Sequence, residues 1–238
     1  MKRLFSRIDK AIWEYRMLEE NDRVLICVSG GADSMALVKI LAERAFIFAR
    51  EIKLYALYVD MGYGNSADQR CSVMQEYLTG LGLEHRILRT HIGPYAHSEE
   101  NLENPCFLCT RIRRKKIFET AEELNCNKIV FAHHKDDIVE TLMLNMIFSR
   151  NISTMPPRLE VMKGKYYIIR PLLFVSETMI KEYRKRNNIP FFDQECPTDG
   201  HSQRQYVKAL LHQIDHDHPG ARENIFQSMY HVKPDYLP

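Results

Sequence analysis

RVLICV at residues 23–28, followed by SGGADS at residues 29–34, is the stretch of this sequence that decides the fold. A short, continuous apolar run of this kind is typical of a buried parallel strand. Glycine and polar residues interrupt the run, and helical spacing of apolar residues resumes over Met35–Arg50. The stretch therefore predicts a strand, a tight turn and a helix in succession.

The same alternation continues in both directions from this stretch. We expect a leading helix at 1–20, a polar loop at 91–105 and a C-terminal helical segment at 203–238. The other predicted strands are 54–59, 85–90, 128–133 and 166–169, and the other predicted helices are 69–81, 111–124, 136–149, 176–187 and 203–214. Alternating strands and helices predict an α/β fold, a doubly wound parallel sheet with helices on both faces, in a single domain spanning 1–238.

The composition excludes several classes of protein. With 238 residues, 45% hydrophobic, the chain is long enough for one sizeable core, which argues against a disordered chain or a disulfide mini-scaffold. Its 33 basic and 31 acidic residues leave a net charge of +2, less basic than a dedicated duplex-binding domain. No apolar run approaches the roughly 20 residues that span a bilayer. We therefore expect a cytoplasmic protein without a membrane partner.

The turn after the first strand has the composition of a phosphate-binding loop. Gly30 and Gly31 let the backbone approach an anion closely, and the N–H groups of the first helical turn add donors. Ser29 and Ser34 supply hydroxyl groups, and Asp33 is expected to act through Mg²⁺ that bridges to phosphate oxygens. The alternative is an ordinary capped corner, which a bare Gly-Gly would favour; the complete string favours phosphate binding.

A second polar string, His133-His134-Lys135-Asp136-Asp137, follows another predicted strand and opens a helix. Paired aspartates near a helix N-terminus suit electrostatic work or metal contact. The alternative is a capped helix start with a satisfied histidine. In this fold ligands bind at the carboxyl ends of strands, where both strings are expected to lie.

Six cysteines occur in the chain, and only Cys106 and Cys109 form a C-x-x-C pair. This usage favours metal or redox chemistry in a reducing compartment over a disulfide framework. A zinc site normally needs four protein ligands, and Cys196 is the natural third ligand from a distant loop. Three cysteines on an iron–sulfur cubane would leave one iron open to sulfide. A redox pair and three unrelated buried thiols remain as alternatives.

Together these strings carry a family resemblance over most of the chain. SGGADS resembles the PP-loop of the ATP-pyrophosphatase superfamily (adenine nucleotide alpha hydrolase-like), whose members adenylate a substrate oxygen and release pyrophosphate. With the cysteines included, the chain resembles the TtcA family of tRNA 2-thiocytidine synthetases. The other matching pieces are the basic run 111–114, Met155-Pro156-Pro157, Arg170-Pro171-Leu172, Arg204-Gln205 and His218-Pro219-Gly220.

The resemblance implies the roles of particular residues. Cys106, Cys109 and Cys196 would hold a 4Fe–4S cluster, and Asp33 and Asp137 would serve the ATP and Mg²⁺ chemistry. The implied ATP contacts are Val28, Ser29, Gly30, Gly31, Ala32, Asp33, Ser34, Val59, Arg113 and Ala132. Ala32 stands where the family usually carries lysine. Residues 111–116 are expected either to contact tRNA phosphates or to form a solvated helix face, with Arg113 the one that faces the site.

The implied activity is ATP-dependent tRNA thiolation. The C2 oxygen of a cytidine, at tRNA position 32, would attack the α-phosphate of ATP, and sulfur would then replace that oxygen. The implied partners are tRNA, a sulfur donor (cysteine desulfurase or sulfide) and a second copy in a homodimer. One alternative is a lysidine-type ligase without a cluster, which the cysteine triad disfavours. The other is an iron–sulfur carrier without ATPase activity, which only Ala32 favours.

Overall fold

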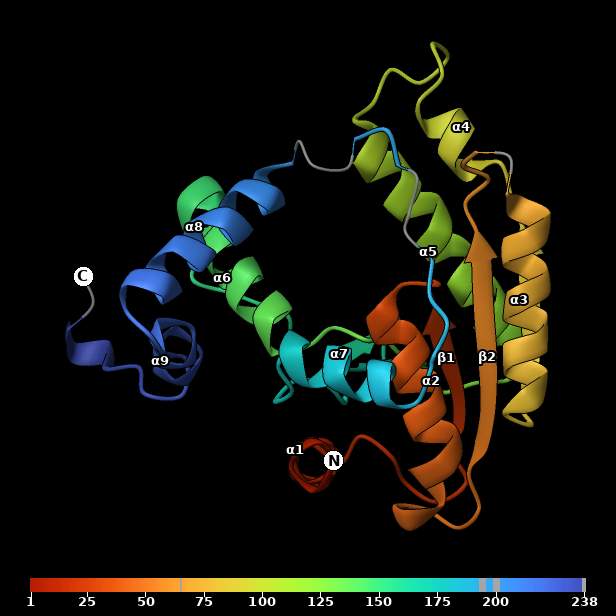
Figure 1. Cartoon of the computed structure of the whole chain (residues 1–238), viewed down its shortest axis with the longest axis horizontal. Helices are drawn as coiled ribbons and strands as arrows, with labels where there is room; N and C mark the ends of the chain where they lie inside the picture. The colour runs from red at the N-terminus through yellow and green to blue at the C-terminus, as the bar shows by residue number, and fades with distance from the viewer. Residues whose placement is uncertain (65, 193–195, 199–201, 237–238) are drawn as a thin grey trace.

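A six-stranded sheet forms the centre of the computed structural model, which describes residues 1–64, 66–192, 196–198 and 202–236 (Figure 1). The strand order is β3-β2-β1-β4-β6-β5. The strands are β1 (Arg23–Val28), β2 (Lys53–Asp60), β3 (Glu84–Arg89), β4 (Lys128–Val130), β5 (Arg158–Val161) and β6 (Tyr166–Ile169). β1 pairs in parallel with β2 and β4, so the predicted phosphate loop leaves the middle of the sheet.

One strand departs from the expected all-parallel sheet. β5, which the sequence analysis missed, pairs antiparallel with β6 at the edge. Its four residues include two exposed ones, so it lacks the apolar run that identified the other strands. Met162 and Lys163 adopt positive φ angles in the turn that joins the two strands. The α/β prediction is confirmed, with an antiparallel hairpin added at one edge.

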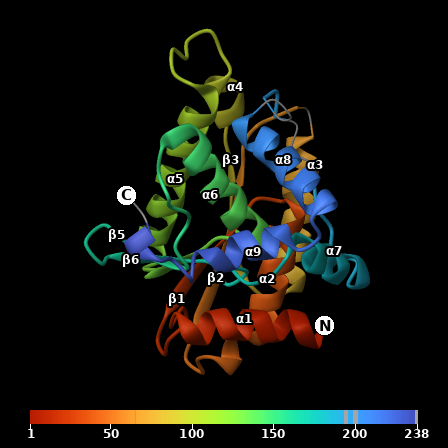
Figure 2. The same cartoon turned by 90° about the vertical axis from the view of Figure 1, so that its left-hand side faces the viewer.

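Helices and short 3₁₀ turns flank this sheet, and α6, α8 and α9 form a group at one side of it (Figures 1 and 2). They are α1 (Lys2–Glu14), α2 (Ala32–Arg44), η1 (Ala45–Ile47), α3 (Ala67–Gly80), α4 (Ile92–Ala96), α5 (Pro105–Glu123), α6 (Lys135–Ser149), α7 (Glu177–Arg186), α8 (Gln203–Asp217), α9 (Ala221–Ser228) and η2 (Pro234–Tyr236). No helix in the described part of the chain is both long enough and apolar enough to cross a membrane.

Several predicted boundaries were wrong. The leading helix ends at Glu14 rather than at residue 20, because Arg16 takes a left-handed conformation. The loop predicted at 91–105 contains α4, and α5 begins at Pro105, so the cysteine pair lies inside the helix rather than before it. Asn104 caps α5 by accepting from two backbone N–H groups. The last two residues of the predicted segment 203–238 lie outside the described residues.

Both faces of the sheet are covered, because successive strand residues point to opposite sides. In β1, Val24, Ile26 and Val28 join one apolar cluster, to which α1, α2, α3 and α6–α9 contribute. Leu25 and Cys27 join a second cluster with side chains of α4 and α5. The predicted phosphate loop therefore projects from a strand that is buried on both faces, which fixes its position.

Asp60, the last residue of β2, is held in a buried ion pair beside this loop. Its carboxylate accepts hydrogen bonds from Arg70 Nε at 3.0 Å, Tyr58 Oη at 3.0 Å and the Gly62 N–H at 2.9 Å. Burial alone would raise the pKa of Asp60, but these bonds, that from Arg70 first, hold the pKa below its usual value. Arg70 also donates to the Tyr63 carbonyl at 2.7 Å and so ties down the following loop.

Replacing Arg70 by methionine is expected to lower the free energy of unfolding at pH 7 by about 3 kcal/mol, because it leaves a buried carboxylate without its cation. The depressed pKa of Asp60 contributes stability above its unfolded pKa, about 3.9, and this contribution is lost as pH falls through the lower folded value. The deficit of Arg70→Met should therefore shrink in acid. Urea unfolding at several pH values measures it.

Arg86→Met is the matched control, because Arg86 is exposed on β3 and its ion pair with Glu84 is 3.7 Å long. An exposed pair of this kind contributes less than about 1 kcal/mol. Equal stability of the Arg70 variant and the wild type at pH 7, or a deficit that grows in acid, would contradict the role assigned to Arg70.

Candidate functional site

The predicted phosphate loop is a tight turn that hydrogen bonds of Ser29 and Ser34 stabilise. Gly30 has φ +87°, and a Cβ there would lie 2.9 Å from the Phe192 ring. Ser34 Oγ accepts from the Ser29 N–H at 3.0 Å and donates to the Gly31 carbonyl at 2.9 Å. Gly31 caps α2, of which Ala32 is the first residue. The loop thus places the unbonded N–H groups of the first turn of α2 at the carboxyl end of β1.

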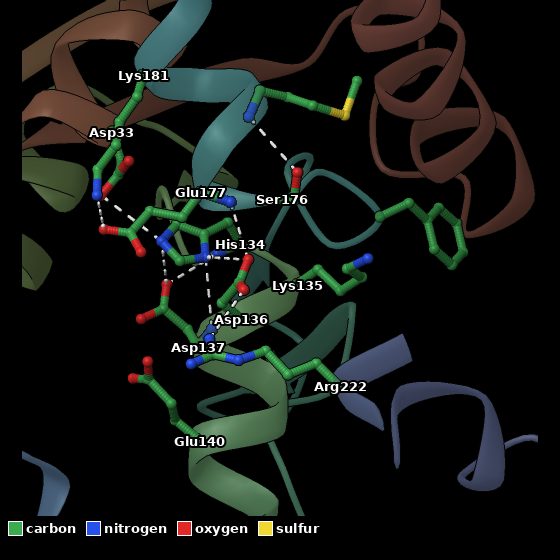
Figure 3. A network of polar contacts seen from close by, with 12 residues as sticks. Asp33, His134, Lys135, Asp136, Asp137, Glu140, Ser176, Glu177, Lys181 and Arg222 are labelled. Atoms are coloured by element: carbon green, nitrogen blue, oxygen red, sulfur yellow. Dashed lines mark hydrogen bonds and ion pairs between the residues drawn. The ribbon is translucent and has the colours of Figure 1, made fainter. Parts of the chain in front are cut away.

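Asp33 and Asp137, the two predicted catalytic residues, meet around one imidazole (Figure 3). His134 Nε2 lies 3.7 Å from Asp33 Oδ2 and 3.5 Å from Asp137 Oδ2, and His134 Nδ1 lies 3.7 Å from Asp136 Oδ2. His134 is buried, and with Asp137 it forms a capping box at the start of α6. Both interpretations of this string therefore apply, because the same residues cap the helix and form a cluster of polar side chains.

The crowding of carboxylates alters their ionisation. Burial raises the pKa of Asp33, the neighbouring charge of Asp137 adds to this effect, and His134 and Lys181 oppose it. Burial likewise raises the pKa of Glu140, one turn further along α6. A carboxyl whose pKa is raised by burial and by a neighbouring carboxylate is a candidate for a functional role.

Three C-terminal helices bring cations to these acids. Arg204 Nη2 lies 2.6 Å from Asp137 Oδ1, and its Nε lies 3.2 Å from Glu140 Oε2. Arg222 of α9 pairs with Asp136 at 3.2 Å. On α7, Lys181 pairs with Glu177 at 2.8 Å and lies beside Asp33 in Figure 3. The sequence analysis did not single out Glu177, Lys181 or Arg222, which carry no motif of their own.

The three predicted cluster cysteines converge around two hydroxyl groups. Tyr63 Oη lies 3.5 Å from Cys109 Sγ and 3.6 Å from Cys196 Sγ. Thr198 Oγ1 lies 3.5 Å from Cys106 Sγ and 3.3 Å from Cys196 Sγ. Cys106 and Cys109 come from the first turns of α5, whereas Cys196 follows α7, so the structure joins segments far apart in the chain. Tyr63 and Thr198 were missed, because nothing local in the sequence marks them.

The surroundings of the thiols set their acidity. Burial raises the pKa of Cys109, and the nearby thiols of Cys196 and Cys106 add to this effect. The Tyr63 hydroxyl and the charge of Arg113 oppose it. Within the ranges that the structure describes, no three His, Cys, Asp or Glu side chains are gathered as ligands of one metal ion.

The Tyr63 ring packs closely against the backbone of Gly93. A Cβ on Gly93 would lie 2.4 Å from the Tyr63 ring, and the His97 ring meets the Tyr63 ring edge-on at 5.8 Å. The short helix α4, which lies within the predicted polar loop, therefore packs against the Tyr63 ring. The helix packs behind the residue that contacts two of the three thiols.

The remaining predicted ATP contacts lie at one edge of the sheet. Val28 and Val59 are at or next to the carboxyl ends of β1 and β2, and Ala132 follows β4 by two residues. Burial raises the pKa of the Cys27 thiol in β1, and Arg113 lies close enough for its charge to oppose this rise. The acid–histidine cluster, which comprises Asp33, His134, Asp136 and Asp137, and the three thiols thus lie at the same edge of the sheet as the phosphate loop.

Comparisons with known proteins agree with this geometry. Residues 2–214 match the family described as PP-loop domain. The chain is 37% identical to a tRNA-cytidine(32) 2-sulfurtransferase of Methylobacillus flagellatus, covering 98% of this chain and 77% of the relative. The corresponding enzyme of Nitrosospira multiformis is 35% identical over 99% of this chain and 79% of its own.

A solved structure shares the fold. The U34-tRNA thiolase NcsA from Methanococcus maripaludis, solved with its [4Fe-4S] cluster, superposes with a TM-score of 0.76 at 21% identity, covering 96% of this chain and 79% of that one. Sequence family and fold point the same way: this chain belongs to the PP-loop family and, within it, to the TtcA family of tRNA-cytidine(32) 2-sulfurtransferases.

Proposed function

We propose that this chain is an ATP-dependent sulfurtransferase that replaces the C2 oxygen of cytidine 32 in tRNA with sulfur. The observation that carries the proposal is the presence of a phosphate loop with an acid–histidine cluster and of three converging thiols at the same edge of one sheet. Thiolation requires both halves, one to activate an oxygen and one to deliver sulfur. The names of the relatives support the substrate.

The first half of the site would bind ATP and activate the cytidine. In this proposal the first-turn N–H groups of α2 and the hydroxyls of Ser29 and Ser34 bind the phosphates. The C2 oxygen attacks the α-phosphorus, and pyrophosphate leaves. Asp33 and Asp137 would hold Mg²⁺, which when bound would stabilise the charge on the phosphates. His134 Nε2 lies near both carboxylates, 3.7 Å from Asp33 Oδ2 and 3.5 Å from Asp137 Oδ2.

The second half of the site would hold a 4Fe–4S cluster on Cys106, Cys109 and Cys196. The residues fit this group, because iron–sulfur clusters are bound by thiolates, and three thiols meet here around Tyr63 and Thr198. When bound with three protein ligands, the cluster would supply the open position from which sulfur is delivered. Tyr63 and Thr198 would hold the thiols in position through their hydroxyl groups.

The other parts of the proposal follow from the reaction. Each turnover consumes one sulfur atom, so a sulfur donor, either cysteine desulfurase or sulfide, is a required partner. We further propose that the chain acts as a single domain in the cytoplasm and that it works as a homodimer.

The first test measures iron and acid-labile sulfide in protein purified without oxygen. About four of each per chain are expected, together with formation of thiolated tRNA on a mercury-affinity gel. Cys106→Ala should lose both the cluster and the thiolation. Cys126→Ala is the control, because Cys126 is buried near the Leu124 carbonyl, away from the triad, and should keep both.

The outcomes separate the alternatives. Full iron content and activity in Cys106→Ala or Cys196→Ala would remove that ligand from the site. ATP-dependent tRNA modification without iron would favour the lysidine-type ligase, and a complete cluster without pyrophosphate release would favour the iron–sulfur carrier.

The ATP half of the site has its own test. Asp137→Asn is expected to lower tRNA-dependent pyrophosphate release by about a hundredfold, because it removes one of the charges that hold the metal near the phosphates. The iron content should stay unchanged. Asp217→Asn, which changes an exposed carboxylate at the end of α8, is the control. Equal rates of pyrophosphate release in the two variants would exclude Asp137 from the chemistry.

A further inference from the structure

Arg170, which directly follows β6, is a buried cation with no carboxylate partner among the described residues. It is 6% exposed. Its Nη1 donates to the Pro156 carbonyl at 2.5 Å, and its Nε lies 3.4 Å from His133 Nδ1. No acid within the described residues lies at ion-pair distance from its guanidinium. Buried charges in proteins are normally paired, because an unpaired one forfeits its hydration, so this guanidinium is suited to binding an anion.

A second cation, Arg114 of α5, has no ion pair among the described residues, and its charge acts on the first. Burial, and next the charge of Arg114 on α5, lower the pKa of Arg170 to about 10. Arg114 is exposed, and the ion pairs of its helix belong to other basic residues: Arg111 pairs with Glu103, and Lys115 and Lys116 pair with Glu119. The two guanidinium groups, one buried and one exposed, are near enough for their charges to interact, and together they are suited to binding one anion.

His133 completes the position. Burial, opposed by the charge of Asp137, lowers the pKa of His133 to about 4, and the charges of Arg170 and Arg204 contribute. The ring is therefore neutral at physiological pH and offers a hydrogen bond without a further charge. It precedes His134, so the position lies next to the acid–histidine cluster.

We propose that Arg114, Arg170 and His133 bind one phosphate group, and that this group is a backbone phosphate of the RNA substrate. The proposal rests on the proposed function. The guanidinium fork suits phosphate oxygens. ATP already has a phosphate loop at the end of β1, whereas Arg170 follows β6, two places along the sheet. A phosphate held there would position the neighbouring nucleotide over the acid–histidine cluster.

The test is the affinity for a fluorescent anticodon stem-loop RNA, measured by anisotropy over a range of salt concentrations without ATP. Arg170→Gln and Arg114→Gln are each expected to weaken binding about tenfold and to reduce the salt dependence by about one ion. Arg170→Lys should recover part of the affinity. Arg186→Gln removes one exposed positive charge from α7 and should leave binding within about twofold of the wild type.

A parallel titration with ATP distinguishes the two sources of phosphate. Unchanged ATP affinity with weakened RNA binding supports the assignment. Weakened ATP affinity with unchanged RNA binding means that the position holds a phosphate of ATP and overturns the RNA assignment, and no change in either overturns the site. Urea unfolding checks that Arg170→Gln folds. If it does not fold, the exposed position 114 still allows RNA binding to be tested with Arg114→Gln.

The fate of this site and that of the proposed function are separable. Arginine-dependent RNA binding by a protein that makes no thiolated tRNA would leave the phosphate site standing and remove the activity. Thiolation by a protein whose RNA binding is insensitive to both arginine substitutions would support the activity and exclude the phosphate site.

Discussion

Negative charge gathered at the carboxyl edge of the sheet is the constraint on which the arrangement of the C-terminal half depends. Asp33, Asp136 and Asp137 surround one imidazole. At an effective dielectric constant of about 20, two carboxylates about 4 Å apart repel each other by about 4 kcal/mol. Cations from two separate helices compensate this charge: Arg204 of α8 pairs with Asp137, and Arg222 of α9 pairs with Asp136. These contacts dock the helices on α6 as well as balancing the charge.

The helix α5 connects the thiols with the proposed phosphate position. Its capped first turn brings Cys106 and Cys109 to one face, because residues three apart lie on the same side of a helix. One turn further, Arg113 lies near the Cys109 thiol, and the next residue, Arg114, lies near Arg170. Ile117 and Ala121 then bury the rest of the helix against the sheet. A single rigid element therefore relates the thiols, the sheet and the phosphate position.

The sequence predicted best what depends on local pattern. The apolar run of β1, the glycine turn and α2 follow from neighbouring residues, and the cysteine pair and the second polar string carried their own spacing. Tyr63 was out of reach, because its value lies in contacts with two thiols, one of them 133 positions away. The strand β5 was not predicted, because a four-residue edge strand with exposed residues lacks the apolar run that marks the other strands. That Arg170 is buried with no carboxylate at ion-pair distance among the described residues can be seen only in the folded chain.

Ala32 shows why a departure from a motif is judged in the folded structure. The family usually has a lysine at this position, and the sequence alone suggests a loop without its cation. In the fold, Lys181 approaches from α7 and its charge lowers the pKa of Asp33 against the effect of burial. Lys181 is anchored by Glu177 at 2.8 Å, and Lys208 of α8 contacts the same carboxylate at 3.4 Å. The positive charge beside the loop is therefore present, supplied by a helix about 150 residues later in the chain.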